Sequence, residues 1–326
     1  ILMSKMQLLR QLWITLNLMA EIYTLNKYYR ERFGQKVYKL SLDGGMTCPN
    51  RDGTLDTRGC IFCSSGGSGD FAASRFLSVK EQINEAKSRI CNKITDGKYI
   101  AYFQAYTNTY APLDYLRNIF YEAAFCDDIV GLSIATRPDC LGSEVLELLD
   151  ELNSKIPVFV ELGLQTIHKE SAHFIRRGYE LEVFNCAVAN LHRININIVV
   201  HLILGLPNET FSDIIASVRY LNNLPVNGVK LQLLHILKNT DLADYYLNKE
   251  NDFHTLSLED YTILLSECIE NLRPDIVIHR MTGDGNKKEL IAPLWSGDKK
   301  RVLNYINTYF TKNNIIQGRK YRKNGT

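Results

Sequence analysis

The chain has 326 residues, of which 45% are hydrophobic and 23% charged, a composition typical of a globular protein with one large domain or two small ones. A formal net charge of +2 excludes a strongly charged chain, and no apolar run approaches the roughly 20 residues that span a bilayer. The eight cysteines are too scattered for a disulfide framework, which predicts a reducing, cytoplasmic location and no membrane partner.

Residues 1–28 are predicted to be a leader or an amphipathic helix that packs on the rest of the chain. Lys5 and Arg10 interrupt the apolar opening stretch, and no small-residue cleavage site follows it before Tyr23. Because Met19 stands just ahead of the first well-patterned segment, we expect the native start at Met19 and regard residues 1–18 as an addition to it.

Residues 29–236 alternate short β-branched runs with amphipathic helical patterns. Strands are predicted over residues 37–42, 99–104, 130–135, 158–162, 198–204 and 229–234. Helices are predicted over residues 79–94, 113–125, 143–152, 181–194 and 210–223. Many of the strands are nearly continuous apolar runs, as in parallel sheets covered on both faces. No glycine-rich phosphate loop follows the first strand, so the pattern predicts an α/β fold built as a partial (β/α)6 TIM-type barrel.

Residues 237–326 are predicted to form a C-terminal α/β extension, with a strand over residues 276–281 and helices over 258–272 and 299–311. From Lys287 onward ten Lys or Arg are opposed only by Glu289 and Asp298, so this basic tail carries a formal charge of 10 − 2 = +8. Such a tail on an acidic body favours a polyanionic partner such as RNA, although a solvated terminus would have the same composition.

Polar side chains gather where four consecutive predicted strands end. They are Gln104 with Thr107, Asn108 and Thr109; Thr136 and Arg137 with Asp139; Glu161 with Gln165 and Thr166; and the segment Gly205, Leu206, Pro207. In a (β/α) barrel the carboxyl ends of the strands form the mouth of the active site. The sequence therefore predicts a functional site at this mouth. Arg137 has an alternative role, because it could anchor its own loop by pairing with Asp139.

Cys48, Cys60 and Cys63 stand in a glycine-rich loop directly after the first predicted strand. Three thiolates can hold three irons of a [4Fe–4S] cluster and leave the fourth iron open to a ligand. Zinc is an alternative, but a structural zinc site takes four ligands and only one Cys-x-x-Cys pair is present. A redox pair of Cys60 and Cys63 would leave Cys48 unused. The spacing favours the cluster and leaves both alternatives open.

The other five cysteines stand singly in helix-like or strand-like segments and are predicted to be small buried hydrophobic residues. They are Cys91, Cys126, Cys140, Cys186 and Cys268.

Several motifs occur in a fixed order along the chain: TCPNRDGTLDTRGCIFC, FQAYTNTY, ATRPD, ELGLQT, LILGLPNET and LLHILKNTDLADYY. Together they resemble the radical S-adenosylmethionine superfamily, and within it the subgroup that shares its core with the catalytic subunit of Elongator. The resemblance covers nearly the whole chain, from Tyr29 to Tyr321. It implies a compact bacterial-type member without an acetyltransferase domain.

The resemblance implies that Cys48, Cys60 and Cys63 ligate a [4Fe–4S] cluster whose open iron binds S-adenosylmethionine. It also implies ten cofactor-binding positions, and for each polar one a structural contact at the barrel rim is the alternative. They are Phe62 near the adenine; Gln104, Thr107 and Asn108 near the methionine amino group; Thr136 and Arg137 at the third strand end; Glu161 and Gln165 near the ribose or the methionine; and Gly205 and Leu206, whose backbone approaches the adenine. No catalytic base is implied.

The implied activity is reductive cleavage of S-adenosylmethionine to a 5′-deoxyadenosyl radical, with a flavodoxin-type or ferredoxin-type electron donor. Kinship with the Elongator subgroup and the basic tail favour transfer RNA as substrate, with modification of a wobble-uridine side chain as the specific hypothesis. Trp295 is a candidate for stacking on a splayed base, and an ordinary core position is its alternative. A radical enzyme acting on a small metabolite and a zinc-containing RNA-binding module are the competing functions.

Overall fold

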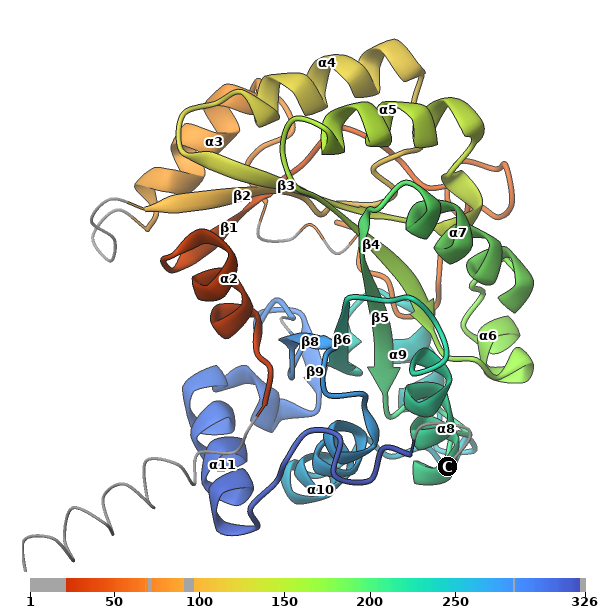
Figure 1. Cartoon of the computed structure of the whole chain (residues 1–326). Helices are drawn as coiled ribbons and strands as arrows, with labels where there is room; N and C mark the ends of the chain where they lie inside the picture. The colour runs from red at the N-terminus through yellow and green to blue at the C-terminus, as the bar shows by residue number, and fades with distance from the viewer. Residues whose placement is uncertain (1–21, 68, 70–71, 91–96, 284, 323–326) are drawn as a thin grey trace, which may run out of the picture.

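The computed structural model describes residues 22–322 except residues 68, 70–71, 91–96 and 284. Its centre is a curled sheet of seven parallel strands in the order β1-β2-β3-β4-β5-β6-β8, a half-barrel of the TIM type (Figure 1). The strands are β1 (Val37–Leu42), β2 (Lys98–Phe103), β3 (Ile129–Thr136), β4 (Val158–Gln165), β5 (Asn197–Leu204), β6 (Gly228–Leu233) and β8 (Val277–Arg280). The predicted α/β partial barrel is thereby confirmed.

Helices cover the outer face of the sheet. They are α3 (Val79–Ser88), α4 (Leu113–Ala124), α5 (Ser143–Asn153), α6 (Lys169–Phe174), α7 (Leu181–Arg193), α8 (Phe211–Leu221) and α10 (Leu258–Asn271). Local sequence fixes where they begin: Ser78 with Glu81 and Thr210 with Asp213 form reciprocal capping boxes at α3 and α8. The helix predicted over residues 79–94 ends at Ser88, and part of the remainder lies outside the described residues.

Successive side chains along each strand point alternately to the outer and the inner face of the sheet. Side chains such as Val160, Val200 and Leu231 point outward into the main hydrophobic core under the helices. The inward positions form layers: Ile100, Phe159 and Val199 are packed with Tyr29 at the amino ends of the strands. Polar and charged side chains occupy the next layer towards the carboxyl ends. The inner face is therefore not the continuous apolar surface that the strand sequences suggest.

Tyr29 belongs to helix α2 (Leu25–Phe33), which closes the amino end of the barrel. Thr24, at the start of this helix, forms a parallel bridge to Ile278 of β8. The question of a native start at Met19 and of a leader over residues 1–18 lies outside the described residues.

The predicted strand at residues 276–281 is present as β8, and it pairs with β6 in the main sheet instead of standing apart in an extension. Six predicted barrel strands thus become seven. The remaining elements of the C-terminal part are β7 (Ile236–Leu237) paired with β9 (Leu290–Ala292), α9 (Asp241–Leu247), the 3-10 turn Leu294–Gly297 and α11 (Lys299–Lys312). Among the described residues, no helix has both the length and the apolarity that a membrane span requires.

The basic tail does not project from the body over its described part. Ile315 is buried, and the Gln317 amide donates to the carbonyls of Arg273 and Ile276. Arg319 and Lys320 form ion pairs with carboxylates of α10. These pairs lie at the barrel end opposite the mouth, because the end of α10 leads into the start of β8.

Trp295 packs against Tyr261, with 5.8 Å between ring centroids, and its indole N–H donates to the carbonyl of Leu256 at 3.0 Å. The structure thus supports the alternative of an ordinary core position for Trp295. It does not support a role of Trp295 in stacking on a base.

Candidate active site

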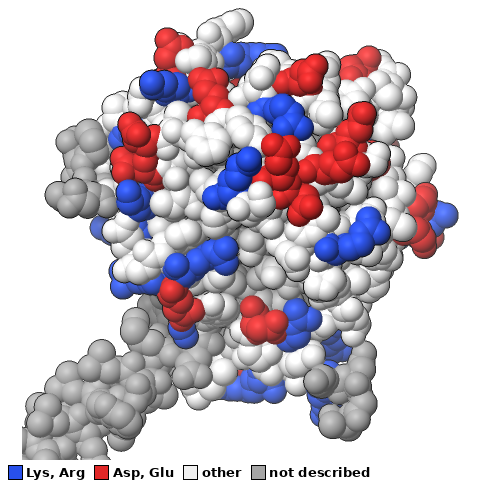
Figure 2. All heavy atoms as spheres, turned by 45° about the horizontal axis from the view of Figure 1, so that its top comes forward, with Lys and Arg blue, Asp and Glu red and all other residues white. Residues whose placement is uncertain are grey.

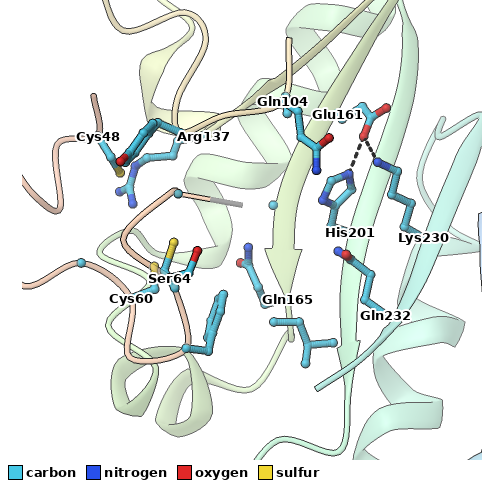
Figure 3. A pocket seen from close by; sticks show the side chains of 18 of the residues that line it. Cys48, Cys60, Ser64, Gln104, Arg137, Glu161, Gln165, His201, Lys230 and Gln232 are labelled. Carbon is cyan, nitrogen blue, oxygen red and sulfur yellow. Dashed lines mark hydrogen bonds and ion pairs between the residues drawn. The ribbon is translucent and has the colours of Figure 1, made fainter. Parts of the chain in front are cut away.

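A cavity of about 250 Å³ opens at the carboxyl ends of the strands (Figure 3). One end is formed by the loop that follows β1, and the opposite end by inward side chains of β4, β5 and β6. Strand ends therefore supply the lining, as predicted from the polar residues that follow them.

Cys48, Cys60 and Cys63 all line the loop end of this cavity. The loop is tightly turned: the Cys63 N–H donates to the Cys60 carbonyl at 3.0 Å, and Gly59 has a φ of 79°. A side chain at Gly59 would come within 2.8 Å of Arg51. Arg51 in turn donates to the carbonyls of Cys63 and Ser64 at 2.9 and 2.7 Å. Gly59 and Arg51 thereby fix the course of the backbone through Cys60 and Cys63.

The sulfur atoms suit an iron–sulfur cluster in number and setting. Burial raises the pKa of the Cys60 thiol to about 12, so binding of a metal there would release a proton. The Asn50 amide N–H points at the Cys60 sulfur at 3.5 Å, a contact typical of cluster ligands. Among the residues described, no three His, Cys, Asp or Glu side chains lie close enough together to hold a single metal ion.

The residues after β2 and β3 divide between cavity and scaffold. Gln104, Thr107 and Thr136 line the cavity. Asn108 does not: it is fully buried, and its amide donates to the carbonyls of Phe103 and Ala135 at 3.1 and 2.9 Å. Its local role is to tie the end of β2 to β3.

Arg137 lines the cavity but is already engaged. Its guanidinium donates twice to Asp139, at 2.9 and 2.7 Å, and once to the carbonyl of Arg177 at 2.8 Å. Burial disfavours its charge, but the bonds and the negative charge of Asp139 raise the pKa of Arg137 above its usual value. The anchoring role, considered as an alternative for this residue, is therefore present in the structure.

Glu161 lies across the cavity in a network that the sequence motifs did not indicate. Its Oε1 accepts from Lys39 at 2.5 Å and from Ser133 at 2.6 Å. Its Oε2 lies 2.7 Å from His201 Nε2 and pairs with the Lys230 ammonium. Both carboxylate oxygens of Glu161 have protein partners, and the residue also lines the cavity.

The charges of this network control its protonation. Although burial alone would raise the pKa of Glu161, the charges of Lys230 and Lys39 hold it well below its usual value. Burial lowers the pKa of His201 to about 4, and the charge of Lys230 adds to the fall. Burial also lowers the pKa of Lys230 to about 7, against the opposing effect of the Glu161 carboxylate. Near neutral pH, Glu161 is ionised, His201 is neutral and Lys230 is close to its midpoint.

The other predicted positions differ in their access to the cavity. Phe62 and Gln165 line it, and Gln165 has a positive φ of 61° that turns the chain at the end of β4. Gly205 and Leu206 are not among the lining residues: Leu206 is buried in a second hydrophobic cluster with Ile61 and Ile203. A side chain at Gly205 would meet Leu256 at 3.3 Å.

His201, Lys230 and Gln232 also line the cavity and were missed from the sequence. They are polar residues at inward positions of otherwise apolar stretches, one in IVVHLIL and two in VKLQL. A polar residue that interrupts a buried strand needs a partner. That signal could have marked all three.

The prediction that the other five cysteines are buried holds for Cys268 alone among those described. Cys186 is exposed, and Cys126 and Cys140 are partly exposed. Cys186 lies on the outer face of α7, where amphipathic helices accept a small residue on either side. Cys91 lies outside the described residues.

Comparison with known proteins places these features in a family. Residues 57–221 match the model of the radical SAM superfamily, and residues 226–312 match the radical SAM C-terminal domain. YtqA of Bacillus subtilis (strain 168) is 43% identical over 304 residues, covering 92% of this chain and 93% of the relative. YhcC of Escherichia coli (strain K12) is 34% identical over 285 residues, covering 87% and 90%.

Among solved structures, the fold is similar to that of archaeal Elp3 from Methanocaldococcus infernus with an N-terminal deletion of residues 1–46. The TM-score is 0.65 at 16% identity, over 86% of this chain and 63% of that one. At this identity the likeness shows a shared fold.

Proposed function

This chain belongs to the radical S-adenosylmethionine superfamily, and we propose that it is an enzyme in which Cys48, Cys60 and Cys63 hold a [4Fe–4S] cluster that binds S-adenosylmethionine. The observation that carries the proposal is the convergence of the three thiols on one end of a cavity at the barrel mouth. The chemistry that such a cluster supplies, when bound, is one-electron cleavage of S-adenosylmethionine to methionine and a 5′-deoxyadenosyl radical that abstracts hydrogen from a substrate.

The residues of the chain position the cofactor and shield it from water. Gln104, Thr107, Thr136 and Gln165 offer polar groups for the methionine and ribose, and Phe62 offers an apolar surface for the adenine. The Asn50 amide directs an N–H at a cluster ligand. An external flavodoxin-type or ferredoxin-type donor and a reducing, cytoplasmic setting complete the proposal, since the three thiols must stay reduced.

Iron and sulfide analysis of anaerobically purified protein tests the cluster. We expect about four irons per chain and 5′-deoxyadenosine formation after reduction with S-adenosylmethionine. Serine at Cys48, Cys60 or Cys63 should abolish both, whereas Cys186→Ser on the exposed face of α7 should leave both unchanged. Colourless protein with one zinc would contradict the proposal and favour the zinc-containing module.

We propose transfer RNA as the substrate, with a wobble-uridine side chain as the site of modification. Exposed lysines at the mouth support this: Lys238 follows β7, and Lys287 and Lys288 follow Gly283 and Gly285, which line the cavity. The Lys238 N–H donates to the Glu289 carbonyl at 2.8 Å, which brings the two segments together. We call Lys238, Lys287 and Lys288 the rim lysines.

Other surfaces of the molecule favour RNA less. Figure 2 shows Lys or Arg interspersed with Asp or Glu on the face that carries α3, α4 and α5. Arg319 and Lys320 of the basic tail are paired with Glu267 and Glu270 of α10, at the end opposite the mouth. The proposed RNA contact therefore moves from the end of the tail to the rim lysines.

Salt-dependent binding of unmodified tRNA tests this placement. Replacing the three rim lysines by Gln should weaken binding and reduce the salt slope by roughly one per lost phosphate contact. The matched control replaces Lys27, Lys36 and Lys155, exposed lysines at the amino end of the barrel, and should bind as wild type does. Cleavage of S-adenosylmethionine without tRNA binding at low salt would sink the RNA proposal and favour a small metabolite.

A further inference from the structure

The inner layer of the barrel places two lysines on one carboxylate. Lys39 Nζ lies 2.5 Å from Glu161 Oε1, and the Lys230 ammonium pairs with Oε2. The Tyr102 ring lies next to both, with Nζ 4.7 and 4.6 Å from its centroid. Glu161 is fully buried and the Lys230 side chain is only 4% exposed. One carboxylate can neutralise one of the two ammonium charges, so a positive charge is left over whenever both lysines are protonated.

The groups that the structure describes on the cavity wall supply no second carboxylate for this charge. Among the described residues that line the cavity, Glu161 is the only Asp or Glu. His201 on β5 is neutral near pH 7 because burial lowers its pKa to about 4. The charge of Arg280 on β8 lowers the pKa of Lys230. A buried charge without a counter-charge is costly. The site therefore favours an anion.

Lys230, His201 and Gln232 line the cavity from β5 and β6, and we call them the cavity floor. Figure 3 shows them across the cavity from Cys48 and Cys60. An ammonium has three N–H donors. Those of Lys230 serve Glu161 and the Tyr102 hydroxyl, the latter at 3.0 Å, which leaves one donor for a ligand.

The inference rests on the proposed function: with S-adenosylmethionine held at the cysteine end, the cavity floor is left for the second molecule. We propose that the cavity floor binds an anionic group, a carboxylate or a phosphate, of the molecule that loses the hydrogen atom. Lys230 is the residue that determines this specificity. His201 and Gln232 contribute neutral hydrogen bonds beside it.

Binding of an anion at Lys230 is coupled to its proton. The described charged and titratable groups around Lys230 are Lys39 on β1, Tyr102 on β2, Glu161 on β4, His201 on β5, and His279 and Arg280 on β8. With its pKa at about 7, Lys230 is partly deprotonated near neutral pH. An anion favours the charged form, so its binding draws in a proton and weakens as the pH rises.

Calorimetric titration of acetate and of inorganic phosphate into the anaerobically purified full chain, with S-adenosylmethionine present, tests the inference. We expect tighter binding at about pH 6 than at about pH 8.5, with proton uptake revealed by the dependence of the heat on buffer. Lys230→Met should weaken binding by about tenfold or more, and Lys230→Arg should restore part of it. Lys155→Met, at an exposed lysine at the amino end of the barrel, should bind as wild type does. The tighter of the two probes identifies the anionic group.

Unchanged anion affinity in Lys230→Met would overturn the inference, as would displacement of the anion by S-adenosylmethionine, since the floor would then belong to the cofactor. If Lys230→Met fails to fold, absence of proton uptake in wild type overturns it equally. These outcomes are independent of the cluster. Wild type without iron contradicts the proposed function, whereas iron and cleavage without anion binding contradict only this inference.

Discussion

The side-chain amide of Asn50 donates one N–H to the sulfur of Cys60 at 3.5 Å and also binds the carbonyl of Arg176 at 2.8 Å. One buried residue thus links the cysteine loop to the chain that follows α6. Asn50 therefore connects the position of Cys60, a proposed cluster ligand, to the packing at the mouth of the barrel.

Replacement of Asn50 by Ala should lower the reduction potential of the reconstituted cluster, because hydrogen bonds to ligand sulfur stabilise the reduced state. It should also cost about 1–3 kcal/mol of unfolding free energy, since the Arg176 carbonyl loses its partner. Potentiometric titration and urea unfolding measure the two effects. Asn118→Ala, on the exposed face of α4, is the matched control. An unchanged potential in Asn50→Ala would argue against this role.

Arg137→Lys should destabilise the protein by about 2–4 kcal/mol. Lysine keeps the charge but cannot make the two parallel bonds to Asp139 together with the bond to the Arg177 carbonyl. Urea unfolding monitored by circular dichroism gives the difference. Arg117→Lys affects an exposed pair with Glu151 and should change stability by less than about 1 kcal/mol. Equal effects of the two substitutions would refute an anchoring role for Arg137.

The free energy of unfolding should decrease as the pH falls, because of the proton that His201 binds. Its folded pKa of about 4 lies below the usual 6.5, so the unfolded chain binds more protons between these values. The contribution of His201 is therefore complete above about pH 6.5 and is lost as the pH falls towards 4, with an upper limit of about 3 kcal/mol. The difference in unfolding free energy between wild type and His201→Asn isolates it. Parallel pH profiles of the two proteins would exclude this contribution.

Truncation after Lys312 should destabilise the fold instead of merely removing charge. It deletes Ile315, buried in the main core, and Gln317, whose amide spans Tyr23, Arg273 and Ile276. A loss of about 3 kcal/mol or more is expected in thermal or urea unfolding. Lys312→Gln changes one exposed charge at the end of α11 and should unfold as wild type does. A truncated chain as stable as wild type would contradict this packing.

Much of the fold and part of the site could be predicted from local sequence patterns. The cysteine loop after β1, the six strands and the polar strand ends follow from residues close together in the sequence, where periodicity and glycine content report the backbone directly. The site residues that line the cavity, such as Gln104, Thr136 and Gln165, were found because the carboxyl ends of parallel strands meet at one mouth.

The sequence by itself determined the order of the βα units and placed three thiols at the mouth of the barrel. Only the tertiary structure decided that Lys39, Tyr102, Glu161, His201 and Lys230 meet, because they come from five different strands and alternation gives the face of a strand but not its partners across the barrel. It also decided that β8 completes the sheet and that the basic tail is tied to α10. Contacts between segments that are far apart in the sequence depend on the curvature and register of the whole sheet. A local sequence pattern does not specify either of these.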